Sequence, residues 1–176
     1  MKKSIYVIRN VLIRVKYGKR VQIPFRFKIE RGADINVIEG NISVGKSVWV
    51  LKNVHLAATF GGNLSIGCHV FINRNCIITS RNSIVIGNRV SFGPNVCIYD
   101  HDHKFDYSGI SSDEYKTAPV VIEDNCWIGA GTIILRGTHI GEGSVIGAGC
   151  VIKGDIPPHS LVTMDRTMNI REIEEC

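Results

Sequence analysis

Two histidines lie close together in the segment YDHDHKFD, where His101 and His103 alternate with Asp100 and Asp102 and are followed by Asp106. An imidazole with an ordinary pKa near about 6.5 can take a proton from a hydroxyl group at neutral pH. A neighbouring carboxylate or backbone carbonyl can hold the ring in the tautomer that does so. The pattern indicates a general base, and the alternative is a surface loop whose histidines have no role.

The elements that position these histidines follow a six-residue repeat. Isoleucine recurs at Ile122, Ile128, Ile134, Ile140, Ile146 and Ile152, and small residues recur at Cys126, Thr132, Thr138, Ser144 and Cys150. An α-helix would scatter this period around its circumference, whereas a β-solenoid repeats one short strand and a bend. We expect the isoleucines to point inward with the small residues beside them. Gly129, Gly141 and Gly147 follow an isoleucine directly and are expected to permit the bends.

The same period runs through the first half of the chain and is then interrupted. Inward rungs are predicted at Ile42, Val48, Val54, Phe60, Ile66, Ile72, Ile78 and Ile84, and after a two-residue insertion at Ile86, Phe92 and Ile98. The pattern stops after Ile98 and returns at Ile122. We therefore expect residues 99–119 to form a loop extruded from the solenoid, and long loops of this kind are usually functional or disordered.

Composition is typical of one soluble domain, with 44% hydrophobic and 21% charged residues. We divide the chain into a basic N-terminal capping segment (1–34), the solenoid (35–158) and a C-terminal tail (159–176). Arg9 and Arg14 interrupt any signal-peptide core, and no segment reaches the apolar length of a membrane span. The six cysteines show no paired spacing, so free thiols and a cytoplasmic location are expected.

The positive charge is concentrated at the N-terminus. Residues 1–31 contain ten Lys and Arg and one acidic residue, Glu30. In one interpretation this segment caps the open end of the solenoid with Ile5, Val7, Val11, Ile13 and Val15. In the other, it is attracted to a membrane surface, to acidic glycans or to lipid-linked sugars. Nucleic acid is not an expected partner, because no recognised binding motif accompanies the charge.

The repeat resembles that of the hexapeptide-repeat acyltransferases over roughly residues 35–171, most specifically in NCWIGAGTIILRGTHIGEGSVIGAGCVIKGDIPP. The blocks FINRNC, IGNRVSFGPNVCIYDHDHKFD and WIGAG are similar to those of sugar O-acetyltransferases, which include galactoside, maltose and polysaccharide O-acetyltransferases. DHDH and EYKTAPVVIEDNCWIG look most like the polysaccharide branch. The resemblance implies an all-β fold, a left-handed parallel β-helix with a protruding loop and a short C-terminal helix.

The resemblance also implies roles for individual residues. The catalytic histidine of the family falls on His103, with His101, Asp100 and Asp102 as possible support. Asn73, in FINRNC, matches an acceptor-binding asparagine, with an Asn at a solenoid bend as the alternative. Trp127 is expected either to wall the sugar site or to contact another subunit.

Acetyl-CoA is the implied co-substrate. Backbone groups at Ala130 and Ala148 match the positions that grip its pantetheine arm, and Lys153, Arg166 and Arg171 are the candidate cations for its phosphates. The sequence departs from the family here, because KGDIPP replaces the usual TKDIPP and MDRT replaces a Gly-x-Pro-Ala turn. No metal is expected, since the ligand spacing of the related γ-class carbonic anhydrases is not visible.

The sequence thus predicts an acetyl-CoA-dependent O-acetyltransferase that acts, as a homotrimer, on a sugar hydroxyl of a bacterial surface polysaccharide or its precursor. Two alternatives stay open. One is acetylation of a small molecule such as a free galactoside or an antibiotic. The other is a β-solenoid that serves as a scaffold without catalysis.

Overall fold

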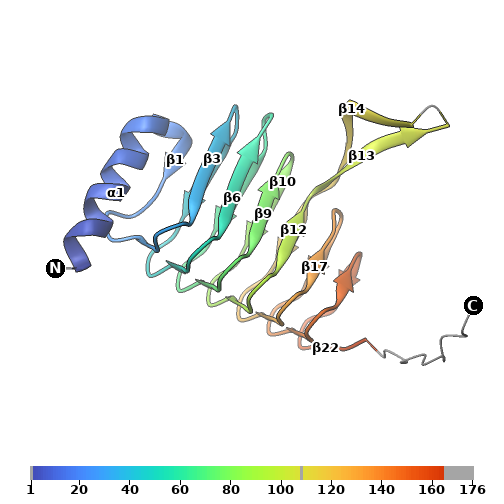
Figure 1. Ribbon diagram of the computed structural model, residues 1–176. Coiled ribbons are helices and arrows are strands. Elements are labelled where there is room, and N and C mark those ends of the chain that lie inside the picture. Colours follow the sequence, from blue (N-terminus) through green and yellow to red (C-terminus); the bar gives the residue numbers. More distant parts are fainter. Residues whose placement is uncertain (1, 108, 165–176) are drawn as a thin grey trace, which may run out of the picture.

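The chain folds into a parallel β-helix with a helix at its N-terminal end and a hairpin that projects from one side (Figure 1). The computed structural model describes residues 2–107 and 109–164, with side chains in the first helix described from residue 6 onward. The short C-terminal helix expected from the resemblance lies outside these residues. The helix α1 spans Lys2–Tyr17 and continues into the 3-10 turn η1, Gly18–Arg20.

Three parallel sheets form the three sides of the β-helix, and each full coil adds one strand to each sheet. The first sheet contains β1 (Val21–Gln22), β4 (Asn41–Val44), β7 (Asn63–Ile66), β10 (Ser83–Ile86), β15 (Val120–Ile122), β18 (His139–Ile140) and β21 (Asp155–Ile156). The second contains β2 (Lys28–Ile29), β5 (Trp49–Val50), β8 (Phe71–Ile72), β11 (Ser91–Phe92), β16 (Trp127–Ile128), β19 (Val145–Ile146) and β22 (Leu161–Val162). The third contains β3 (Asp34–Ile38), β6 (His55–Thr59), β9 (Ile77–Ser80), β12 (Cys97–Tyr99), β17 (Ile133–Ile134) and β20 (Val151–Ile152).

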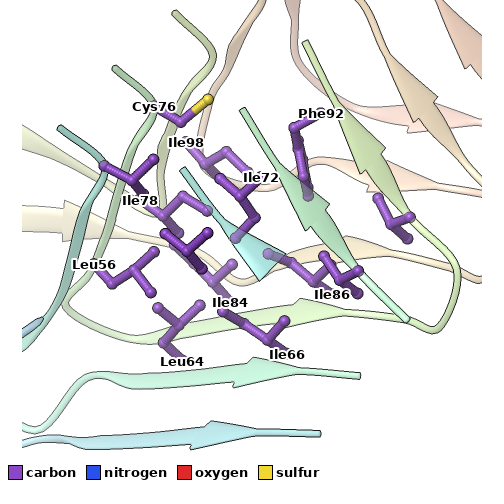
Figure 2. Close-up of a cluster of buried hydrophobic side chains, with 14 of the residues drawn as sticks. Leu56, Leu64, Ile66, Ile72, Cys76, Ile78, Ile84, Ile86, Phe92 and Ile98 are labelled. Atoms are coloured by element: carbon purple, nitrogen blue, oxygen red, sulfur yellow. The ribbon is translucent and has the colours of Figure 1, made fainter. Parts of the chain in front are cut away.

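The core is a narrow stack of aliphatic rungs, as the repeat predicted. The six C-terminal isoleucines and the five small residues beside them are all buried. Figure 2 shows the middle of the stack, where Leu56, Leu64, Ile72, Ile84 and Phe92 point into the shared core. Burial raises the pKa of the Cys76 thiol to about 11, which suits its use as a small apolar filler. The five cysteines within the described part of the chain are free, as expected.

The predicted rung at Phe60 is wrong. Its ring is 61% exposed and its backbone has a φ of 52°. Ile42 pairs with Leu64, so this coil takes 22 residues, whereas Ile122 and Ile140 mark a coil of 18. The extra residues form a corner after β6 and place Phe60 on it. The shorter insertion before Ile86 is confirmed, because Leu64 pairs with Ile84 after 20 residues.

The glycine after each isoleucine is needed for close stacking and not for the bend. A Cβ at Gly129 would lie 2.6 Å from the backbone nitrogen of Ala148 in the next coil, and Gly129 does not have a positive φ. The left-handed conformation falls two residues later, at Gly131, and on Asn75 and Asn95 in the equivalent corners of earlier coils. Asparagine tolerates this region better than other residues with a Cβ, which explains why it alternates with glycine there.

Candidate active site

The segment between β12 and β15 forms an antiparallel hairpin, whereas the repeat alone indicated a loop. Its strands are β13 (His101–Asp106) and β14 (Gly109–Thr117), and His101 lies opposite Thr117 while His103 lies opposite Tyr115. The base of the hairpin is closed by the Ala118 amide, which donates to the carbonyl of Asp100 at 3.0 Å. Since His101 and His103 are two residues apart on one strand, both side chains project from the same face.

Asp102 points to the other face and fastens the hairpin to the solenoid. Its Oδ2 accepts a hydrogen bond from Nε of Arg136 at 2.5 Å, and Arg136 belongs to the following coil. Asp102 was a candidate for direct support of the catalytic histidine. In the structure its carboxylate is engaged with Arg136 and holds the position of the strand that carries both histidines.

Asp100 is a fully buried carboxylate at the foot of the hairpin. It accepts hydrogen bonds from the Ser80 hydroxyl (2.7 Å) and from the backbone amides of Arg81 (2.8 Å) and Asn82 (2.9 Å). Burial by itself raises the pKa of Asp100, but the bonds from His101, Arg81, Ser80 and Asn82 outweigh it and hold the pKa below its usual value. Asp100 is therefore ionised at neutral pH.

His101 is oriented by this carboxylate. Its Nδ1 lies 3.0 Å from Oδ1 of Asp100, and its side chain is only 14% exposed. The rings of Tyr99 and Tyr115 pack edge-on against it, with centroids at 6.1 and 5.8 Å. Because an ionised carboxylate can only accept a hydrogen bond, Nδ1 of neutral His101 carries the proton. The Nε2 atom then has a free lone pair and can accept a proton.

His103 lies further out on the same face and is exposed to solvent. Its Nδ1 lies 3.3 Å from the carbonyl oxygen of Ser111, and its ring centroid lies 4.5 Å from that of Tyr115. A carbonyl can only accept, so Nδ1 carries the proton in this contact and Nε2 keeps its lone pair. Both imidazoles thus meet Tyr115, and both have Nε2 available as a base.

A pocket of about 280 Å³ lies beside the histidine face of the hairpin. It is lined by Phe60, Arg81, Ser112, Asp113, Tyr115 and Thr117. The guanidinium of Arg81 stands 4.3 Å from the ring centroid of Phe60 and 3.7 Å from that of Tyr115. Ring faces, a cation and hydroxyl groups together suit a polar ligand with apolar faces, as a sugar has.

Sequence reasoning missed the residues of this pocket. Phe60 was assigned to the core because its spacing matched the period, although Gly61 and Gly62 directly after it signalled a break. Arg81 stands in the corner between β9 and β10, where the repeat gave no sign of a functional residue. Tyr115 becomes a neighbour of the histidines only through the register of the hairpin, which periodicity does not reveal.

The predicted acceptor residues lie on another side of the chain. Asn73 directly follows β8, and its Oδ1 accepts a bond from the amide of Arg74 at 2.8 Å. Trp127 projects outward from β16 and is 57% exposed. Both belong to the second sheet, whereas the hairpin leaves the corner between the third sheet and the first. One chain by itself does not bring Asn73 or Trp127 to the histidines.

The predicted cofactor positions stack along one corner of the solenoid. The carbonyl of Ala130 accepts a bond from the amide of Gly149 at 2.7 Å, so Ala130 and Ala148 stand one above the other in successive coils. Ala148 and Lys153 are exposed and Ala130 is half-buried. Arg166 and Arg171 lie outside the described residues. Residues 2–107 and 109–164 contain no group of three His, Cys, Asp or Glu that could hold a metal.

Comparison with known proteins connects this fold and site to enzymes. Residues 119–154 match the family model for the bacterial transferase hexapeptide (six repeats). Galactoside O-acetyltransferase of Escherichia coli is 33% identical over 133 residues, which are 76% of this chain and 64% of that protein. The matched segment covers between 58% and 64% of the length of the first curated relatives.

Two solved structures of acetyltransferases are also similar to this chain. A maltose O-acetyltransferase from Clostridium difficile is 30% identical, with 97% of this chain and 77% of that one covered and a TM-score of 0.54. A hexapeptide-repeat acetyltransferase of Vibrio cholerae, solved with acetyl coenzyme A, is 35% identical, with 70% and 65% covered and a TM-score of 0.60. The chain belongs to the hexapeptide-repeat acyltransferase superfamily, in the branch of the sugar O-acetyltransferases.

Proposed function

We propose that the chain is an acetyl-CoA-dependent O-acetyltransferase that modifies a sugar hydroxyl of a bacterial surface polysaccharide or its precursor. Membership of the family supports acetyl transfer, and the relative solved with acetyl coenzyme A supports the donor. The observation that carries the proposal is His103, whose Nδ1 is held by the carbonyl of Ser111 beside a pocket suited to a sugar. Because the reaction uses acetyl-CoA and the described thiols are free, it is assigned to the cytoplasm.

His103 is the general base of the proposed reaction. Its Nε2 takes the proton of the acceptor hydroxyl as the oxygen attacks the thioester carbonyl of acetyl-CoA. The tetrahedral intermediate collapses to the acetyl ester and the thiolate of coenzyme A, which takes the proton back from the imidazole. His101, held by Asp100, packs edge-on against Tyr115 and keeps that ring in place beside His103.

The pocket beside the hairpin is the proposed acceptor site. Phe60 and Tyr115 line it with apolar surface for the C–H side of a sugar, and Ser112 and Thr117 offer hydroxyl groups to its polar edge. Arg81 and Asp113 add one charge of each sign, which can bind the hydroxyl groups of a sugar.

A trimer would complete the site. Outward positions are mostly apolar in register along the second sheet (Trp49, Phe71, Trp127, Val145 and Leu161, with Lys28 and Ser91 as polar members) and along the third sheet (Ile77, Cys97, Ile133 and Val151, with Asp34 and His55 as polar members). On the first sheet they are mostly polar (Gln22, Ser43, Ser65, His139 and Asp155). Two different apolar faces per chain fit a closed ring with three-fold symmetry.

In such a ring the second sheet of one subunit meets the third sheet of the next. The hairpin would then lie near Asn73 and Trp127 of the partner subunit, which is the arrangement that their predicted role at the acceptor requires. Coenzyme A would lie along the stacked backbone at Ala130 and Ala148, with Lys153 near its phosphates. Arg166 and Arg171 remain the other candidate cations.

The experiment that tests the function is a thiol-release assay with acetyl-CoA and a panel of acceptors. The panel contains acidic oligosaccharides, neutral oligosaccharides, free galactosides and aminoglycosides. Turnover with an oligosaccharide that is lost in His103→Ala supports the proposal. Turnover with a free galactoside or antibiotic alone would move the function to small molecules, and no thiol release with any acceptor would favour a scaffold.

A further inference from the structure

The helix α1 is turned so that its polar residues face the solenoid. Asn10 is fully buried, and its Nδ2 donates to the carbonyls of Phe25 (2.9 Å) and Phe27 (3.0 Å). Nε of Arg14 donates to the carbonyl of Ile23 at 3.0 Å, and the Tyr17 hydroxyl donates to that of Ile35 at 2.8 Å. Arg9 donates to the carbonyls of Glu30, at 2.7 Å, and Ala33.

The first coil of the solenoid explains this orientation. Each internal coil gives its backbone groups to neighbouring coils on both sides, whereas the first coil has no coil before it. Its carbonyls would be left without donors, at a cost in free energy wherever water is excluded. Side chains that donate hydrogen bonds therefore cap this edge better than apolar ones. The expectation that Val7, Val11 and Val15 cover the open end is wrong, since all three are exposed, while Ile13 does pack against the core.

The opposite face of α1 is apolar and turned to solvent. Ile8 and Leu12 are each 63% exposed and Val15 is 77% exposed, with Val11 beside them. Spacings of three and four residues place these side chains on one stripe of the helix. Ile5 belongs to the part of α1 whose side chains are not described. Apolar side chains gathered on one exposed stripe mark an interaction surface.

Positive charge is concentrated at the same end of the solenoid. Lys16, Lys19, Arg20, Arg26 and Lys28 are exposed around the end of α1 and on the first coil, and Glu30 is the single acidic residue of the first 31. An apolar helix face flanked by cations is the arrangement of helices that lie in the surface of an anionic bilayer. A second copy of the chain docked through the same face would bring these cations together and be repelled.

We propose that the outward face of α1, formed by Ile8, Val11, Leu12 and Val15, docks onto an anionic lipid bilayer. Within the residues that the structure describes, no helix is long and apolar enough to cross a membrane. The helix would therefore lie along the surface, with its polar side still bound to the first coil. In the proposed trimer, three copies of α1 stand at the same end and bind one surface together.

Docking of α1 onto a bilayer does not depend on acetyl transfer. Only the use of docking, which is access to a lipid-linked acceptor, rests on the proposed function. An enzyme bound at the bilayer would meet a lipid-linked glycan precursor in two dimensions. The test of docking therefore measures membrane binding without substrate, so that its failure and the failure of the proposed function are distinguished.

The first experiment is co-sedimentation of the full chain with large vesicles of equal parts phosphatidylcholine and phosphatidylglycerol. The triple variant Ile8→Ser, Leu12→Ser, Val15→Ser should bind about tenfold or more weakly than the wild type. Val85→Ser, which removes an exposed apolar side chain from the first sheet, away from α1 and from the proposed trimer faces, should bind like the wild type. Circular dichroism and the melting temperature of the triple variant show whether the β-helix is intact.

The second experiment tests the charges. Lys16→Gln, Lys19→Gln, Arg20→Gln should weaken binding about tenfold or more at low salt, whereas Lys46→Gln, Lys52→Gln, Arg74→Gln removes the same charge elsewhere and should have a smaller effect. Binding should fall with added salt and with vesicles of phosphatidylcholine alone. Equal binding by the wild type and the triple serine variant, or no binding to anionic vesicles, would overturn the proposal. Salt-resistant association into pairs of trimers, lost in the serine variant and without vesicle binding, would assign the face to self-association instead.

Discussion

The carboxylate of Asp100 lies 3.0 Å from Nδ1 of His101 at the point where the hairpin leaves the solenoid. The same carboxylate binds the backbone amides of Arg81 and Asn82 in the preceding coil. One buried side chain therefore orients an imidazole of the candidate site and also fixes the hairpin that carries it.

Asp100 makes the stability of the fold depend on pH. Its pKa is lower in the folded chain than in the unfolded one, so its contribution to stability is complete above the unfolded value of about 3.9 and is lost as pH falls through the folded value. Asp100→Asn should lower the free energy of unfolding at pH 7 and show a smaller further loss below about pH 4. Urea unfolding at a series of pH values measures this, with the exposed Asp155→Asn as control. Parallel curves for Asp100→Asn and the wild type would contradict the assignment.

The rung pattern predicts opposite effects for neighbouring substitutions in β10. Ile86 is buried and Val85 is 40% exposed on the polar first sheet. Ile86→Asp buries an unpaired charge and should unfold or aggregate the chain, whereas Val85→Asp should change the free energy of unfolding by less than about 1 kcal/mol. Solubility and melting temperature distinguish the two. A soluble Ile86→Asp with an unchanged melting temperature would show that the inward phase is wrong.

Two glycines of the WIGAG block should respond in opposite ways. Gly129→Ala places a Cβ 2.6 Å from the backbone of the next coil and should destabilise the fold by about 1–3 kcal/mol. Gly131 has a φ of 68° and no atom closer than 4.0 Å to an added Cβ. Gly131→Asn should be tolerated within about 0.5 kcal/mol, because Asn75 and Asn95 occupy the same corner. Denaturation curves that reverse this order would refute the stacking argument.

The proposed trimer has its own test. Light scattering should give three times the chain mass of 19.5 kDa. Val151→Asp, on the apolar third sheet, should shift the mass toward the monomer, because a charge would be buried at the interface. Val85→Asp on the first sheet should leave the trimer intact. A wild-type chain that stays monomeric at micromolar concentration would exclude a site shared between subunits.

Periodicity predicted the parts of the fold that repeat and failed where the repeat is broken. Ile122 to Ile152 were placed correctly because strict spacing leaves one inward phase. The prediction for Phe60 was wrong because its corner is four residues longer than the corner of an 18-residue coil. The longer corner shifts the inward phase, and an apolar residue occupies the position that the unshifted period predicts. The helix α1 gave no usable signal, since its inward residues, such as Asn10 and Arg14, are polar and serve carbonyls that only the three-dimensional structure reveals.

The site was predictable only in part for a related reason. His101 and His103 stand out by composition and by their place at the phase break. Their neighbours Arg81 and Tyr115 come from other segments and are joined to them by hairpin register and corner geometry. Asn73 and Trp127 would join the site only in the proposed trimer, because one chain places them on another side of the solenoid.

The most direct test of the account is the kinetic ranking of the two histidines. His103→Ala should keep the melting temperature and acetyl-CoA binding but lower kcat by roughly 10²- to 10⁴-fold, the usual effect of losing a general base. His101→Ala should lower kcat less, because His101 acts through Tyr115. A larger loss in His101→Ala would give the role of base to the imidazole bound by Asp100, and small, equal losses in both variants would contradict catalysis by this hairpin.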